Sequence, residues 1–152
     1  MIQKLLRMPQ AALLWTKALE SASRGRYHDV IEYLKKIELL GIRYFEYDIL
    51  GGVAANRLGE HALAIDLFER AEKSIRHDRF IKESVRQYLL YFIAICAQDS
   101  AQHGELDIGD KFYIEPKIAL DQVPNRIKRN FPLENHLAPA GKAGEPGVAA
   151  YE

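Results

Sequence analysis

A turn followed by a helix occurs twice in this chain, and the fixed spacing between the copies constrains the fold more than any other feature. The stretch GRYHDVI begins at Gly25, and the stretch GEHALAI begins 34 residues later at Gly59. Small Ala18, upstream of the first copy, is likewise matched by Gly52 upstream of the second. Self-similarity at such a period is typical of repeat architectures, in which each unit stacks on its neighbour. The chain is therefore predicted to be all-α, an α-solenoid of antiparallel helix pairs.

Length, charge and hydropathy exclude several classes of protein. The chain has 152 residues, enough for one domain with a sizeable core. Basic and acidic residues balance at 21 each, which argues against nucleic acid as a partner because phosphate binding needs a basic surface. No apolar run reaches the roughly 18 residues of a membrane span, and no secretory signal is convincing. We expect a soluble, cytoplasmic protein without a membrane span.

Apolar residues at helical spacing place two helix pairs in the first half of the chain. Residues 1–9 are expected to be a short lead-in, followed by repeat one over about residues 11–44. Repeat two is expected over about residues 45–78. Its first helix contains two consecutive glycines, which cost about 1 kcal/mol each relative to alanine. Close approach of a neighbouring helix at Gly52 is the expected compensation.

A third long helix is expected over residues 79–98, but the 34-residue register fails there. One period after Gly52 the sequence has Arg86, although repeat packing requires a small residue. Residues 99–115 contain two glycines and five acidic residues and are expected to form a loop. Whether residues 79–131 complete a third repeat stays open at this point.

The segment 123–131 is expected to be a short amphipathic helix, because its apolar residues recur every four positions. Two roles stay open for it. It can cap the array by covering the apolar face of the third helix, which is favoured because solenoid ends need covering. Alternatively, it can fold back onto the concave face of the stacked repeats and occupy the place of a partner. The helical domain is expected to span residues 1–137, and residues 138–152, rich in Ala, Gly and Pro, to be a disordered tail.

The 34-residue unit resembles the tetratricopeptide repeat (TPR) family over about residues 11–78. Repeat two matches the family pattern of small, turn and apolar residues at Gly52, Gly59, Ala64, Phe68 and Ala71. Repeat one matches it at Ala18, Gly25 and Tyr27. The chain departs from the pattern at Asp48, where the family has a bulky residue, and both repeats lack the closing proline. The resemblance implies a concave groove, lined by the first helix of each repeat, that takes a peptide or a partner helix.

The residues that would line this groove follow from the same resemblance. They are Trp15, Leu19 and Ala22 in repeat one, and Glu46, Ile49, Val53, Asn56 and Arg57 in repeat two. One subclass of the family grips carboxylates with lysines and asparagines, but the corresponding positions here hold Trp15, Leu19 and Leu50. An apolar groove implies recognition of a hydrophobic segment of a protein partner, with burial supplying the affinity. The resemblance thus implies a non-enzymatic adaptor or chaperone-like module.

The chain contains no recognisable catalytic or metal-binding motif. Its five histidines are scattered, and none has the paired spacing of a zinc-binding helix. His77 and Asp78 come nearest to a base with an orienting carboxylate, but a cationic side chain is also favoured at a helix end. Cys96 lies on an apolar stripe, which favours a packed core residue over a nucleophile. We expect no enzymatic activity, no cofactor and no metal ion.

Other interpretations remain open from the sequence alone. Trp15, the only tryptophan, is either a core residue or an anchor at an interface. The sequence has one basic cluster, which consists of Arg126, Lys128 and Arg129. For this cluster a solvated helix face is favoured over a phosphate contact. The second functional hypothesis is a structural subunit of a homo-oligomer or larger complex that uses the same apolar surface.

Overall fold

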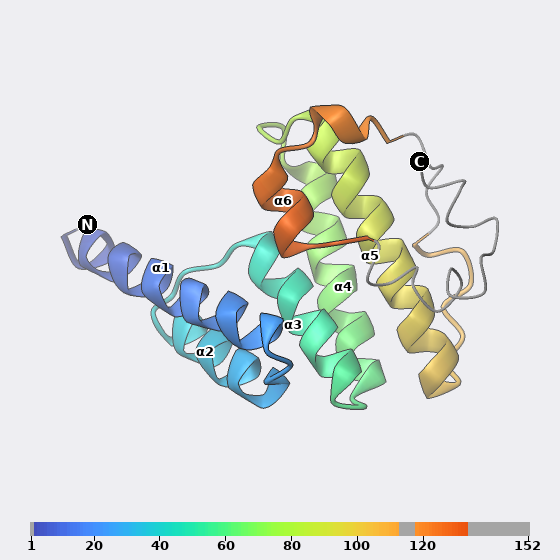
Figure 1. The fold of residues 1–152 in the computed structure, drawn as a ribbon, viewed down its shortest axis with the longest axis horizontal. Coiled ribbons are helices and arrows are strands. Elements are labelled where there is room, and N and C mark those ends of the chain that lie inside the picture. The colour runs from blue at the N-terminus through green and yellow to red at the C-terminus, as the bar shows by residue number, and fades with distance from the viewer. Residues whose placement is uncertain (1, 113–117, 134–152) are drawn as a thin grey trace.

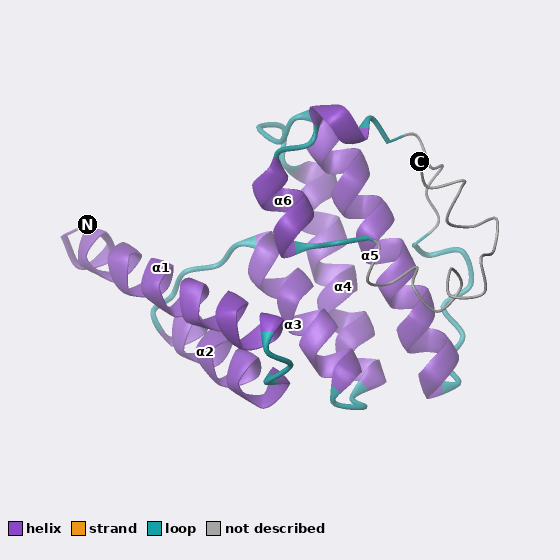
Figure 2. Cartoon of the chain, in the orientation of Figure 1, coloured by secondary structure: helices purple, strands orange, loops and turns teal. Residues whose placement is uncertain are grey.

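All regular structure in the described part of the chain is helical (Figures 1 and 2). The computed structural model describes residues 2–112 and 118–133. Its elements are α1 (Ile2–Ser23), α2 (Tyr27–Leu39), α3 (Phe45–Arg57), α4 (His61–His77), α5 (Glu83–Gly104), the 3-10 helix η1 (Leu120–Gln122) and α6 (Asn125–Asn130). The predicted all-α class is confirmed.

The five long helices pack in the order in which they occur in the chain. Each helix contacts the next, from α1 on α2 to α4 on α5, and η1 lies against α5 (Figure 1). Among the described residues, none of the helices combines the length and the hydrophobicity that a membrane crossing requires. The core is continuous from α1 to α6, since buried residues of all six helices belong to one apolar cluster.

The turn that occurs twice in the sequence has the same backbone geometry in both places. Gly25 and Gly59 have φ values of +73° and +82°, in the left-handed region that favours glycine. The amide after each glycine donates to the carbonyl five residues earlier, at 2.8 Å in the first turn and 2.9 Å in the second. This pattern is the Schellman helix end, which satisfies carbonyls at the helix terminus. The 34-residue period is thus present in the hydrogen bonds of the backbone.

The third helix differs from its expected bounds. α5 spans Glu83–Gly104 rather than residues 79–98, so the predicted loop over 99–115 is wrong for its first six residues. The helix begins late because the Asp78 carboxylate accepts a hydrogen bond from the Phe80 amide at 2.9 Å, a local turn that competes with helix. It continues past residue 98 because Ser100 and Ala101 are buried and extend its packed face.

Arg86, the residue that breaks the 34-residue register, has a structural role at the end of α4. Its guanidinium donates to the Asp78 carbonyl at 2.6 Å and also to the Ile75 carbonyl. The last carbonyls of a helix lack partners within the helix, so a cation that binds them stabilises the helix end. A long basic side chain therefore replaces the small residue that a strict repeat would place here.

The expected lead-in is part of the first helix. α1 runs from Ile2 to Ser23 without a break and contains Pro9, so the separation of residues 1–9 from repeat one is wrong. Pro9 removes one backbone hydrogen bond, but the helix continues beyond it. The Arg7 guanidinium donates to the Leu40 carbonyl at 3.3 Å, which attaches this part of α1 to the end of α2.

The amphipathic segment near the end of the described chain is confirmed as a helix with a buried face. Val123, Ile127 and Phe131 are all buried, as the four-residue spacing predicted. The Phe131 ring meets Phe92 of α5 edge-on at 5.6 Å, and the Tyr88 hydroxyl donates to the Phe131 carbonyl at 2.6 Å. The segment thus covers α5. The predicted tail, residues 138–152, lies outside the described residues.

Candidate functional site: the hollow between α1 and α6

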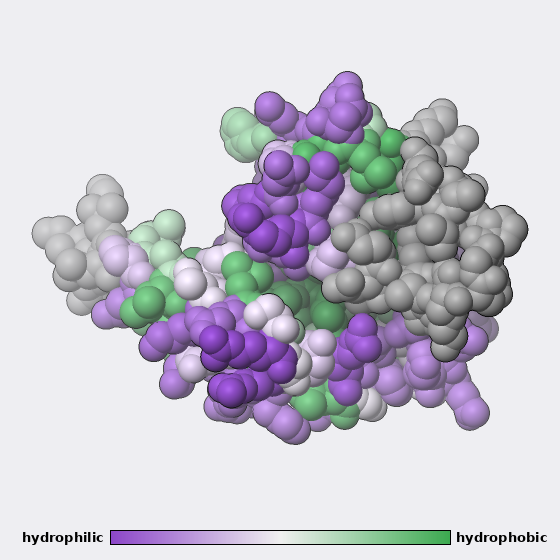
Figure 3. Space-filling model, viewed as in Figure 1, coloured by the Kyte–Doolittle hydropathy of each residue, from purple (hydrophilic) through white to green (hydrophobic). Residues whose placement is uncertain are grey.

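A hollow with an apolar floor lies between α1 and α6, over α3. Figure 3 shows hydrophobic residues gathered there, with the hydrophilic surface of α6 on one side and that of α1 on the other. The predicted groove residues come from α1 and α3. Their burial decides which of them a partner can reach.

The α1 residues of the predicted groove form a partly accessible strip. Trp15, Leu19 and Ala22 follow each other at helical spacing on one face, and all three are half-buried. The Trp15 ring packs on Tyr47 of α3 with 5.1 Å between centroids. Part of the Trp15 ring therefore packs against the core, as one of its two possible roles predicted, and part remains accessible.

The α3 residues of the predicted groove divide into accessible and inaccessible ones. Val53 and Asn56 are half-buried, and Arg57 is exposed. Ile49 is 0% exposed and Glu46 is 2% exposed, so a partner cannot reach them in this conformation. Ile49 lies in the core because α3 is enclosed by neighbouring helices over more of its surface than the repeat pattern implied. We call the accessible residues Trp15, Leu19, Ala22 and Val53 the apolar strip.

Glu46 is inaccessible because α6 covers it. The Arg126 guanidinium donates to the Glu46 carboxylate at 3.1 Å, across 80 positions of sequence. Arg126 itself stays about half exposed. The C-terminal segment therefore covers the first turn of α3 in addition to α5. The segment covers the apolar face of α5, as the favoured role predicted, and it also covers Glu46, one of the predicted groove residues. That it takes the place of a partner stays a prediction.

Tyr44 lies beside this ion pair, so the pKa of its phenol depends on the charges of Glu46 and Arg126. Burial and the neighbouring negative charge of Glu46 raise the pKa of Tyr44 from 10.0 to about 12. The unfolded chain therefore loses the phenol proton first. The stability contributed by the neutral phenol is complete below pH 10 and is lost as the pH rises through about 12. We expect the phenolate absorbance to show a tyrosine that titrates near pH 12, and Tyr44→Phe to remove it. Loss of a transition near pH 10 instead would contradict the described environment of Tyr44.

Asn56 joins the three helices α3, α4 and α5. Its amide nitrogen donates to the Asp99 carboxylate of α5 at 2.7 Å. The Nδ1 of His61, in α4, lies 2.7 Å from the Asn56 side-chain oxygen. Asp99 is also paired with His103 at 3.3 Å. Asn56 therefore holds helices together, a role that the resemblance did not suggest.

The other residues considered for chemistry have structural surroundings. Cys96 is buried, and burial raises the pKa of its thiol well above the ordinary value, which disfavours the nucleophilic thiolate. The Nδ1 of His77 lies 2.7 Å from the Lys73 carbonyl within the same helix. The Lys128 ammonium donates to the Leu120 carbonyl at 3.2 Å. Within the described ranges, no three histidine, cysteine or acidic side chains come together in a way that could hold a metal ion.

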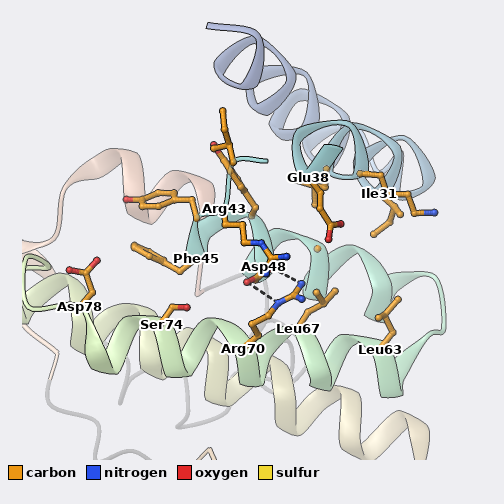
Figure 4. Close-up of a pocket in the computed structure, with 16 residues that line it drawn as sticks. Ile31, Glu38, Arg43, Phe45, Asp48, Leu63, Leu67, Arg70, Ser74 and Asp78 are labelled. Carbon is orange, nitrogen blue, oxygen red and sulfur yellow. Dashed lines mark hydrogen bonds and ion pairs between the residues drawn. The ribbon is translucent and has the colours of Figure 1, made fainter. Parts of the chain in front are cut away.

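A second recess, which the sequence analysis missed, lies between α2 and α4 with α3 as its floor (Figure 4). This cleft has a volume of about 560 Å³. Leu63 and Leu67 lie at one end, and Arg70 donates two hydrogen bonds to Asp48, at 2.9 and 3.2 Å, near the middle. Gly51 leaves space on the floor. One position of the sequence indicated this recess, because Asp48 occupies a place where the TPR pattern has a bulky residue.

The Asp48 carboxylate is only partly solvated in this cleft. Burial raises the pKa of Asp48 above its ordinary value, although hydrogen bonds from Arg70 act in the opposite direction. Acidic and basic side chains are equally numerous around the cleft: Glu38, Asp48 and Asp78 against Lys35, Arg43 and Arg70. The cleft therefore has no net charge that would favour a charged ligand.

Comparisons with known proteins do not assign this geometry to a family. No family model, no curated protein and no solved structure matches the chain. The functional conclusion therefore rests on the packing, the accessible surface and the charges of the described residues.

Proposed function

We propose that this protein is a non-enzymatic, TPR-like interaction module, an adaptor or chaperone-like protein that binds a hydrophobic peptide or helix of a protein partner. The binding site is the hollow between α1 and α6, with the apolar strip as its contact surface. The observation that carries this proposal is twofold: Trp15, Leu19 and Ala22 of α1 and Val53 of α3 are all partly exposed, and hydrophobic surface gathers in the hollow between α1 and α6. Solvated apolar side chains that converge in a concavity are typical of protein-binding sites.

The energetics of the apolar strip favour protein binding. Each Å² of apolar surface removed from water contributes about 25 cal/mol, so the strip supplies affinity without any charge. Trp15 is enough to dominate such a site, since tryptophan is enriched among the few interface residues that carry most of the binding energy. Its contact with Tyr47 restricts the indole before binding, which lowers the entropy lost on association.

The recurrence of the turn at Gly25 and Gly59 supports the TPR-like part of the proposal. Both turns have the same hydrogen bonds and the same sign of φ, and each joins two packed helices. The first helices of the two pairs, α1 and α3, contact each other through the rings of Trp15 and Tyr47.

Replacing Trp15 by alanine should weaken partner binding by about 2 kcal/mol or more. The matched control is Leu13→Ala, because Leu13 is an exposed apolar residue of α1 that lies outside the apolar strip. Proteins retained by immobilised wild type and by each variant are compared by mass spectrometry, and the dissociation constant of the purified partner is then measured. Partners retained equally by wild type and Trp15→Ala would refute the assignment of the site. Light scattering on the chain alone checks for a homo-oligomer that uses the same surface.

A further inference from the structure

We propose that the partner segment is an acidic amphipathic helix, with apolar side chains on the apolar strip and carboxylates that bind guanidinium groups at both ends of the hollow. This inference rests on the proposed function and specifies the chemistry of the partner. It is carried by three observations: the charges left unpaired around the hollow, their spacing along α3, and the way in which the chain itself covers the rest of the same face.

The acidic groups on this face are already engaged. Glu46 is buried and paired with Arg126 at 3.1 Å. Asp99 accepts a hydrogen bond from Asn56 and is paired with His103. The Glu46 carboxylate is therefore unavailable to a basic partner, and the Asp99 carboxylate, 42% exposed, already accepts the Asn56 hydrogen bond.

The basic groups on this face are in part free. Arg57 is exposed and lies on the same face of α3 as Glu46 and Val53, at spacings of eleven and four residues. Arg129 is exposed and lies three residues after Arg126, so the two share one face of α6. Neither Arg57 nor Arg129 forms an ion pair with another residue in the described ranges. These two unpaired charges, one on the Val53 face of α3 and one beside Arg126 on α6, are both guanidinium groups, which bind carboxylates well.

The spacing between the Arg126–Glu46 contact and Arg57 matches a helix of about three turns. Arg126 contacts α3 at Glu46, and Arg57 is eleven residues further along the same helix, a distance of about 16 Å at 1.5 Å per residue. A partner helix spans this distance with eleven residues. We therefore expect acidic residues near both ends of the segment and apolar residues on the same face between them.

The chain supplies a precedent for a helix on this face. α6 already lies on α5 and on the first turn of α3, with an apolar side toward the core and Arg126 bound to Glu46. Figure 3 shows hydrophobic surface next to the hydrophilic surface of α6. A partner helix placed beside α6 would pack in the same way. Its charged groups would be acidic where those of α6 are basic, because the unpaired guanidinium groups belong to this chain.

A display library of random peptides about 16 residues long, sufficient for more than three helical turns, tests this inference on the full chain. Peptides are selected on the wild type and counter-selected on Trp15→Ala, so that only ligands dependent on the strip remain. We expect enrichment of Asp and Glu at both ends of an apolar, helical pattern. Arg57→Glu and Arg129→Glu should each weaken the best peptide by about tenfold, and added salt should weaken it further. The control Lys73→Glu, on the exposed side of α4, should have no effect.

The possible outcomes separate the inference from the proposed function. Peptides that depend on Trp15 but show no acidic enrichment, or that bind Arg57→Glu and Arg129→Glu as tightly as wild type, overturn the acidic helix and leave the binding module standing. The same holds if the selected acidic peptides bind in an extended conformation, as circular dichroism of the complex would show. A selection without any Trp15-dependent peptide overturns both.

Discussion

Replacing Phe131 by alanine should lower the free energy of unfolding by about 3–5 kcal/mol. Phe131 is 0% exposed although it lies just after a helix of only six residues. Its ring packs edge-on against Phe92, and its carbonyl accepts the Tyr88 hydroxyl hydrogen. Truncation would leave a cavity that α6 is too short to close, because so short a helix has little stability of its own. Denaturant unfolding followed by circular dichroism measures the change.

The matched control for Phe131→Ala is Arg129→Ala in the same short helix. Arg129 is exposed, so its truncation should change stability by no more than about 0.5 kcal/mol. If Phe131→Ala keeps the stability of the wild type and tightens partner binding, the segment is a displaceable competitor and not a cap. That result would show that the buried position of Phe131 does not persist in solution.

Replacing Gly52 by leucine should lower the free energy of unfolding by about 3 kcal/mol, at the upper end of the usual cost of overpacking. A Cβ atom at this position would lie 2.5 Å from the nearest atom of the Phe68 ring. The Phe68 ring is fully buried and cannot move aside without disturbing the contact between α3 and α4. The close approach predicted from two glycines in a helix is therefore present at Gly52.

The neighbouring glycine provides the control for Gly52. A Cβ atom at Gly51 would lie 3.3 Å from the end of Leu67 and 3.4 Å from the end of Leu34, both flexible side chains. Gly51→Ala should therefore cost little, and alanine gains about 1 kcal/mol over glycine in a helix interior. Gly52→Ala should still be destabilising. Equal melting temperatures for the two alanine variants would contradict the close packing of Gly52 on Phe68.

The local features of the fold were predictable because short-range chemistry determines them. The turn after α1 needs a positive φ at position 25, and the glycine there indicates such a turn. The turn after α3 has the same requirement, which Gly59 meets. The amphipathic spacing of residues 123–131 likewise predicted a buried face, because four-residue periodicity is a property of the helix itself.

Contacts between distant parts of the chain could not be predicted in this way. Nothing in the local sequence of Glu46 indicates that Arg126, 80 positions later, covers it. The role of Arg86 at the end of α4 depends on how α4 and α5 meet, which no periodicity encodes. The same limit explains why the sequence predicted an accessible face for Glu46 and Ile49. The repeat pattern indicates which residues share a helix face, but not which parts of the chain pack on that face.

The proposed site is tested most directly by a crystal structure of the full chain with a peptide selected for Trp15-dependent binding. We expect the peptide in the hollow between α1 and α6, with its apolar side chains against Trp15, Leu19 and Val53. A peptide bound instead in the cleft between α2 and α4, beside Asp48 and Arg70, would contradict the assignment of the hollow as the binding site.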